Sequence, residues 1–143
     1  MQIRQVIYRS KKASGFPESE IQSMFQNFKT PNTTYEITGI LFYIDGNFIQ
    51  CLEGSEANIE QLLSNIIHDP RNTALTILSD SMVKGRRFPT WWMGFRNMSA
   101  NELMQQKGFV DISRKETLEG LLSHYKEMLN LMIDFYDSEQ INP

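Results

Sequence analysis

Residues 37–54 constrain the fold more than any other segment of the chain, because their pattern is typical of a β-hairpin. Two stretches rich in β-branched, aromatic and other apolar residues flank the dipeptide Asp45-Gly46. Asp-Gly suits a tight turn whose two central residues both take positive φ. The segment therefore predicts two antiparallel strands joined by a two-residue turn.

One residue of the second predicted strand is out of place among apolar neighbours. Strand alternation puts Phe48, Gln50 and Leu52 on the same face. A buried amide without partners costs about 1–3 kcal/mol, so we expect a polar group opposite Gln50. Alternation leaves a second interpretation open, in which Gln50 lies on the solvated face or pairs with backbone.

Hydrophobic periodicity predicts the elements around this hairpin. Strands are predicted where β-branched and apolar residues alternate, and helices where apolar residues recur at three- and four-residue spacing. The predicted elements are a strand over residues 3–10, a helix from 18 to about 29 that Pro31 ends, a helix after Ser55 that stops at Asp69-Pro70, and strands over 74–82 and 90–98. The resulting order, βαββαββ, favours an α+β sandwich of the ferredoxin-like kind, with two helices covering one face of a sheet.

Two further expectations concern the packing of side chains. Alternation along the fifth strand places Trp91, Met93 and Phe95 on one face and Trp92, Gly94 and Arg96 on the other. The core is expected to contain an apolar set from the two helices: Ile21, Met24, Phe25, Ile59, Leu63, Ile66 and Ile67.

The C-terminal part of the chain is predicted to be helical. Capping-box spacing begins at Ser99 and again at Ser113. Apolar residues then recur from Leu118 to Tyr136, which predicts a helix of about six turns. We expect a domain over residues 1–98 and a helical extension over 99–143, packed on the open sheet face or at an oligomer interface.

Composition and motifs narrow the class of protein. A chain of 143 residues with a net charge of −3 is long enough for one core and has no basic excess for nucleic acid. Cys51 is the only cysteine, and no Cys/His spacing suggests a metal. No signal peptide or membrane span is apparent, so a soluble cytoplasmic protein is expected. No hydrolytic constellation or glycine-rich phosphate loop indicates an enzyme.

A series of short motifs runs in a fixed order through residues 2 to about 98. They are Tyr8 with Ser10, Asn32 seven residues before Gly39, Phe48-Ile49-Gln50, Leu52-Glu53-Gly54, Asp69-Pro70-Arg71, Arg87-Phe88 and Trp91-Trp92-Met93. In this order and spacing they closely resemble the BLUF domains, which are blue-light sensors using flavin adenine dinucleotide. The resemblance implies the ferredoxin-like fold, with the isoalloxazine ring held between the two helices.

The resemblance also implies roles for individual residues. Tyr8 would be the photochemical electron and proton donor, and Gln50 the amide between that phenol and the flavin. Trp91 and Met93 would couple the flavin site to the fifth strand. The residues implied in cofactor binding are Tyr8, Asn32, Gln50, Ile66, Asp69 and Arg71, although Asp69 could instead only terminate its helix. The cofactor would be FAD, with FMN or riboflavin as alternatives.

Two residues depart from the family pattern. Asn72 stands where the family usually has His, and Trp92 is bulkier than the residue common between the Trp and the Met. Neither change removes the Tyr8 and Gln50 pair.

The function implied by the resemblance is blue-light sensing with output to an unidentified downstream protein, through the C-terminal helices or through rearrangement of a homo-oligomer. Neither direct nucleic-acid binding nor membrane binding is expected. Two rival hypotheses stay open: a light-insensitive ferredoxin-like interaction module, and a small enzyme of the acylphosphatase sort.

Overall fold

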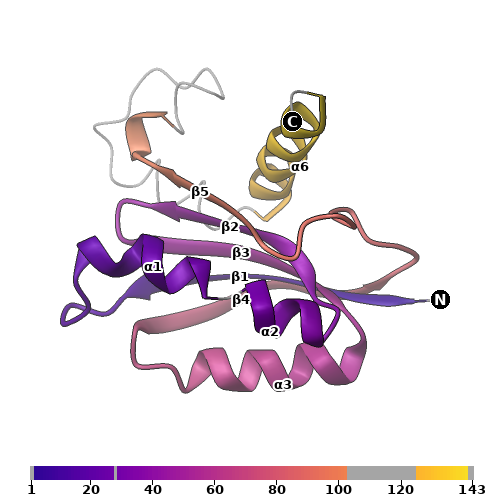
Figure 1. The fold of residues 1–143 in the computed structure, drawn as a ribbon, viewed down its shortest axis with the longest axis horizontal. Helices are drawn as coiled ribbons and strands as arrows, with labels where there is room; N and C mark the ends of the chain where they lie inside the picture. The colour runs from indigo at the N-terminus through magenta and orange to yellow at the C-terminus, as the bar shows by residue number, and fades with distance from the viewer. Residues whose placement is uncertain (1, 28, 103–124, 142–143) are drawn as a thin grey trace.

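The computed structural model describes residues 2–27, 29–102 and 125–141, and the strands among them form one mixed sheet (Figure 1). The strands are β1 (Ile3–Lys12), β2 (Thr38–Ile44), β3 (Asn47–Gly54), β4 (Asn72–Val83) and β5 (Gly94–Met98). Their order in the sheet is β4-β1-β3-β2-β5. Neighbouring strands are antiparallel except β2 and β5, which are parallel.

Helices cover both faces of the sheet (Figure 1). The described helices are η1 (Glu18–Glu20), α1 (Ile21–Gln26), α2 (Lys29–Thr34), α3 (Glu56–Ile67) and α6 (Tyr125–Ile141). One core lies between the sheet and the side chains of α1 and α3, and a second lies between the sheet and α6. This arrangement confirms the predicted α+β, ferredoxin-like sandwich with additional C-terminal helix.

The hairpin forms as the sequence predicts. Asp45 and Gly46 have φ values of 44° and 85°, the positive values of a tight primed turn. The turn sets the register in which Tyr43 pairs with Phe48. Ser55 caps α3, because its side chain accepts a hydrogen bond from the Asn58 backbone N–H at 3.3 Å.

Two helix predictions were wrong. Residues 18–29 do not form one helix that Pro31 ends, because Pro31 lies in the first turn of the separate helix α2. Proline is tolerated there, since the N–H it lacks has no partner within the helix. Ile67, expected in the core, is 56% exposed at the last residue of α3.

The prediction for the fifth strand was also wrong at its start. β5 begins at Gly94, not at residue 90, and a turn closed by a 3.4 Å bond from the Trp91 N–H to the Phe88 carbonyl precedes it. Trp91 therefore packs with the α6 core while Met93 lies in the core on the α1 and α3 side. The two residues do not share a face.

Helix α6 covers the second face of the sheet. Its buried residues are Met128, Leu131, Met132 and Tyr136. Of the first predicted capping box, the N-cap bond forms, because the Glu102 N–H donates to Ser99 Oγ at 3.1 Å. The second box at Ser113 and the start of the stripe at Leu118 lie outside the described residues, and the domain boundary at 98/99 stays a prediction. None of the helices described is long and apolar enough to cross a membrane.

A substitution at Gly39 can test the close pairing of β2 and β3. Its φ is +152°, and a Cβ there would lie 1.9 Å from the carbonyl oxygen of Cys51. We expect Gly39→Ala to lower the free energy of unfolding by roughly 3 kcal/mol or more, because backbone atoms cannot move aside cheaply. Urea denaturation measures the change. Gly85→Ala is the matched control, since a Cβ at Gly85 meets nothing within 4 Å. Equal losses in the two variants would contradict the account of this contact.

Candidate functional site

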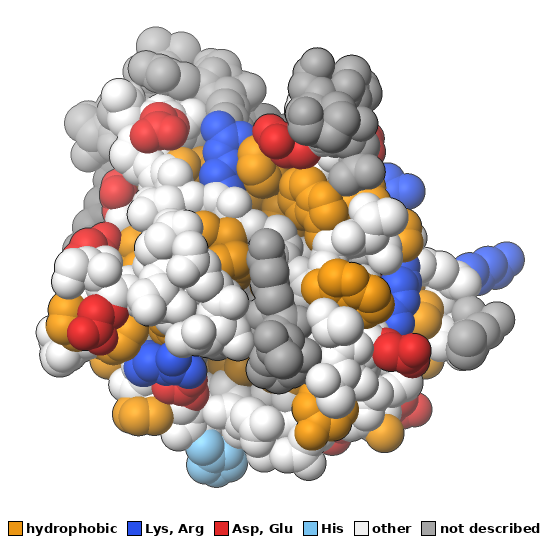
Figure 2. All heavy atoms as spheres, in the orientation of Figure 1, with side chains coloured by type: hydrophobic (Ala, Val, Ile, Leu, Met, Phe, Trp, Pro, Cys, Tyr) orange, Lys and Arg blue, Asp and Glu red, His pale blue; other side chains and the backbone are white. Residues whose placement is uncertain are grey.

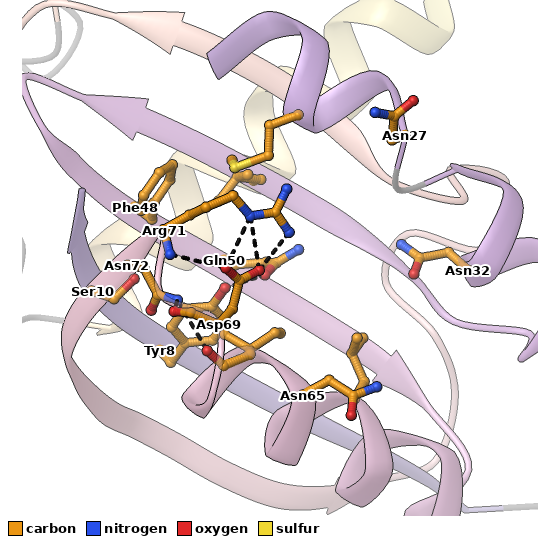
Figure 3. A pocket seen from close by; sticks show the side chains of 14 residues that line it. Tyr8, Ser10, Asn27, Asn32, Phe48, Gln50, Asn65, Asp69, Arg71 and Asn72 are labelled. Atoms are coloured by element: carbon orange, nitrogen blue, oxygen red, sulfur yellow. Dashed lines mark hydrogen bonds and ion pairs between the residues drawn. The ribbon is translucent and has the colours of Figure 1, made fainter. Parts of the chain in front are cut away.

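A cavity of about 320 Å³ lies between the sheet and the helices α1, α2 and α3 (Figure 3). Its size falls in the range of small-molecule sites. On the face shown in Figure 2, Lys and Arg side chains are separated by acidic, apolar and other groups. The cavity is lined by Tyr8, Ser10, Met24, Asn27, Asn32, Leu41, Phe48, Gln50, Leu62, Asn65, Ile66, Asp69, Arg71 and Asn72.

Strand register brings a phenol and an amide together on the floor of this cavity. Tyr8 on β1 is paired directly with Gln50 on β3. Both side chains are buried, and the Tyr8 hydroxyl donates a hydrogen bond to Gln50 Oε1. The Gln50 Nε2 donates in turn to Met93 Sδ at 3.1 Å. The polar group expected opposite Gln50 is therefore Tyr8.

The environment of Tyr8 keeps its proton in place. Burial raises the pKa of Tyr8 well above its ordinary value of 10.0, and the negative charge of Asp69 adds to the rise. The phenol is therefore protonated near neutral pH, and it offers its proton along the hydrogen bond to Gln50.

A charged pair lies at the same cavity, after the end of α3 (Figure 3). The Arg71 Nε donates to both carboxylate oxygens of Asp69, at 2.9 and 3.0 Å, and the Arg71 backbone N–H donates to Asp69 Oδ1 at 2.9 Å. The hydrogen bond from the guanidinium lowers the pKa of Asp69, and the carboxylate raises that of Arg71. A positive group is thereby held where it can meet an electron-rich ligand atom.

Two asparagines fix backbone around the cavity. Asn32 on α2 is buried, and its Nδ2 donates to the Trp92 carbonyl at 2.9 Å. Asn72, the departure from the family's histidine, donates to the carbonyls of Ile66 and Asp69, both at 3.0 Å. Asn72 thus ties the end of α3 to the start of β4.

Ser10 gives the clearest sign that the cavity receives a polar ligand. Its Oγ is buried in the cavity lining and has no hydrogen-bond partner among the described residues. Buried polar groups are rarely left unpaired, so a ligand atom is expected to bond to it. Together with the amides of Asn32 and Gln50 and the guanidinium of Arg71, this hydroxyl fits a ring system whose edge carries both donors and acceptors.

The structure brings most of the sequence-predicted residues together, with two exceptions. Tyr8, Asn32, Gln50, Ile66, Asp69 and Arg71 all line the cavity. Met93 does not line it but contacts Gln50, whereas Trp91 lies on the α6 side of the sheet. There the Trp91 ring packs edge-on against Phe135 and Tyr136, with centroid distances of 5.6 and 4.8 Å.

Sequence reasoning gave no site role to three polar residues of the cavity, namely Ser10, Asn27 and Asn65. Ser10 was named only as part of a motif with Tyr8, although strand alternation also puts it on the same face as Tyr8. Asn65 lies three residues after Leu62, so helical spacing places it on the same side of α3. Asn27 follows the end of α1 and has no comparable signal in the sequence.

Comparisons with known proteins agree with this geometry. The sequence model described as "BLUF: Sensors of blue-light using FAD" matches residues 3–94. The blue light- and temperature-regulated antirepressor BluF of Escherichia coli strain K12 is 31% identical over 83 residues, which cover 58% of this chain and 21% of that protein. The photoactivated adenylate cyclase subunit beta of Euglena gracilis is 27% identical over 85 residues, which cover 59% of this chain and 10% of that protein. The chain therefore spans about a fifth or less of the length of these relatives.

One solved structure matches this chain over most of its length. The structure described as "BlrB - a BLUF protein, dark state structure" superposes with a TM-score of 0.76 at 25% identity. The match covers 96% of this chain and 97% of that one.

The Asp69 and Arg71 pair should make the free energy of unfolding depend on pH. Because the folded-state pKa of Asp69 lies below its ordinary value of 3.8, the pair stabilises the fold above that pH and loses its contribution as pH falls through the folded pKa. The difference in free energy of unfolding between wild type and Asp69→Asn should be constant near neutral pH and shrink below about 3.8. Urea denaturation across this range measures it.

Arg71→Met serves as the partner control for this prediction. Arg71→Met should likewise reduce the pH dependence of the free energy of unfolding. The double variant should have a free energy of unfolding little lower than that of either single variant. A difference between wild type and Asp69→Asn that does not change with pH would contradict the pairing.

Proposed function

Because the chain belongs to the BLUF family, the sensors of blue light that use FAD, we propose that it binds a flavin non-covalently in the cavity and responds to blue light through a hydrogen-bond change at Gln50. The observation that carries the proposal is the buried chain of hydrogen bonds from Tyr8 through Gln50 to Met93. It links a protonated phenol to an amide that can both donate and accept.

The residues around the cavity suit the polar edge and the flat ring of a flavin. Asn32, Gln50 and Arg71 would satisfy the polar edge, and the unpaired Ser10 hydroxyl would gain a partner. Side chains such as Leu62 and Ile66 would provide apolar walls. When bound, the flavin would supply the absorption of blue light and the excited state that accepts an electron and a proton. FAD is the proposed cofactor, with FMN and riboflavin as alternatives.

Tyr8 and Gln50 would be the protein side chains that take part in the photochemistry. Tyr8 holds its proton in the dark and lies in hydrogen-bond contact with the Gln50 carbonyl, so it can release an electron and pass a proton along that bond. The far partner of Gln50 is a thioether sulfur, which is only a weak acceptor. Little energy therefore holds the amide nitrogen against Met93 Sδ, so this is the bond of Gln50 that would change first.

The signal would leave the site through the segment before β5. Met93 contacts Gln50 on one side of the sheet, and Trp91, two residues earlier, contacts α6 on the other. Thr90 Oγ1 and the Tyr136 hydroxyl also form a 2.8 Å hydrogen bond. A change at Gln50 would therefore bias the position of α6 within the proposed 99–143 extension. From there it would reach an unidentified downstream protein, or rearrange a homo-oligomer.

The first prediction from this proposal concerns the cofactor. The protein should purify yellow, with an oxidised flavin that denaturation releases, because the bond is non-covalent. Chromatography of the released pigment distinguishes FAD from FMN and riboflavin. A colourless protein that also fails to take up any of the three would remove the proposal and leave a ferredoxin-like interaction module.

The second prediction concerns the two central side chains. Blue light should shift the flavin band of the wild type reversibly to the red, because a stronger hydrogen bond to the ring stabilises the excited state more than the ground state. Tyr8→Phe costs about 1 kcal/mol of hydrogen bonding and should leave a folded, yellow protein without the shift. Gln50→Leu should behave in the same way.

Tyr43→Phe is the matched control for Tyr8→Phe. Tyr43 is another buried phenol on the same side of the sheet, and its hydroxyl donates to Glu18 at 2.5 Å. This variant should keep the red shift and its reversal in the dark. If Tyr8→Phe and Gln50→Leu kept them as well, the assignment of these two residues would be wrong even with flavin bound.

A further inference from the structure

Glu53 is a carboxylate buried on the side of β3 opposite to Gln50. It lies three residues after Gln50 on the same strand and is 0% exposed. Its carboxylate accepts hydrogen bonds from the backbone N–H groups of Arg87 and Phe88, each at 2.9 Å, and from Gln5 Nε2 at 3.0 Å. Burying a charge is costly unless such donors surround it, so the contact holds the segment at 87–88 firmly to the sheet.

The segment that Glu53 holds leads directly to Met93. Phe88 is fully buried, and its carbonyl accepts the Trp91 N–H at 3.4 Å. The Trp91 carbonyl then accepts the Gly39 N–H at 3.0 Å, and Met93 follows two residues later. Successive hydrogen bonds therefore fix the backbone from the Glu53 carboxylate almost to the Met93 side chain.

A second anchor holds the start of this segment. The Arg86 guanidinium donates to the Thr38 hydroxyl and to the Glu53 carbonyl, both at 2.8 Å, and to the Glu36 carbonyl at 2.6 Å. Arg86 binds these groups from a partly exposed position, whereas the Glu53 carboxylate binds the next two residues from within the core.

We propose that Glu53 is a positioning residue for the light response, because its carboxylate fixes the turn from Arg87 to Trp91 and so holds Met93 Sδ against Gln50 Nε2. One strand then carries both the amide that changes and the carboxylate that places its partner. The meaning for light sensing rests on the function proposed above. The positioning itself is a property of the chain and can be tested in the dark.

Glu53→Gln weakens this hold with little change in size. Oε1 would accept from the Arg87 and Phe88 N–H groups only as a neutral acceptor, and the bonds of Oε2 to Arg87 and Gln5 would be lost. The amide keeps one acceptor oxygen, but its NH2 group would face N–H donors and could not accept from them. Gln5→Met is the matched control. It removes one hydrogen bond to the same carboxylate, the one from Gln5 Nε2, and leaves the bonds from Arg87 and Phe88 intact.

Oxidation of methionine by hydrogen peroxide in the dark measures the effect at Met93. Trypsin releases residues 88–96, whose only methionine is Met93, and residues 13–29, whose only methionine is Met24. Both side chains are buried, at 2% and 7% exposure. Mass spectrometry of the two peptides then separates local release from general loosening, in samples matched for flavin content.

The expected result is specific to one peptide and one variant. Glu53→Gln should speed oxidation of Met93 roughly tenfold, the effect of losing a charge-assisted hydrogen bond on local opening, with Met24 unchanged. Gln5→Met should leave both rates close to wild type. Unchanged Met93 oxidation in Glu53→Gln, or equal increases at Met93 and Met24, would overturn the proposal.

Two additions keep the test decisive. If Glu53→Gln does not fold, Glu53→Asp keeps the charge but withdraws the carboxylate from the loop by one methylene, and the same outcomes apply. In flavin-loaded protein, the return from the red-shifted state to the dark state should be roughly threefold slower in Glu53→Gln. The reason is that the weak bond to Met93 Sδ, which favours the dark arrangement of the Gln50 amide, is lost. An unaltered recovery rate with Met93 released would overturn the link to the light response.

Discussion

The hydrogen bond between Tyr8 and Gln50 exists because β1 and β3 pair in one particular register. Val6 is opposite Leu52, and Tyr8 is therefore opposite Gln50, two residues further along each strand. A slip of one residue would turn Gln50 to the α6 side, away from the cavity. The apolar residues on both faces of β3 hold this register, while the tight turn at Asp45-Gly46 fixes the register of β3 with β2. The site is thus a consequence of how the sheet is assembled.

The same strand connects the two faces of the molecule. Gln50 faces the cavity, while Glu53 faces the opposite side and bonds to the segment that leads to Met93. That segment passes around the sheet, with Trp91 packed against α6 and Met93 against Gln50. The buried amide of Gln50 is therefore connected to the C-terminal helix by one side-chain contact, three residues of backbone and the packing of the Trp91 ring.

Much of this arrangement follows from local patterns in the sequence. The hairpin and the cap at Ser55 depend on turn chemistry and on the pattern of a few residues, and the structure confirms them. Alternation left the position of Gln50 open, and the structure shows that it is buried. The side of the sheet on which Trp91 lies could not be read in this way. It depends on the turn at Phe88 and on Gly94, where a Cβ would lie 2.1 Å from the Trp91 ring. The unpaired hydroxyl of Ser10 likewise becomes apparent only when helices and sheet enclose it.

The proposed function requires that light alter the hydrogen bonds of the Gln50 side chain. The most direct test is the NMR spectrum of the glutamine side-chain amides, recorded from ¹⁵N-labelled protein in the dark and under blue light and assigned with Gln50→Leu. The Gln50 NH2 resonances should move under illumination and return in the dark, while those of Gln5, bonded to Glu53, should move little. Gln50 resonances that stay unchanged in protein whose flavin band has shifted would show that the hydrogen bonds of Gln50 do not respond to light.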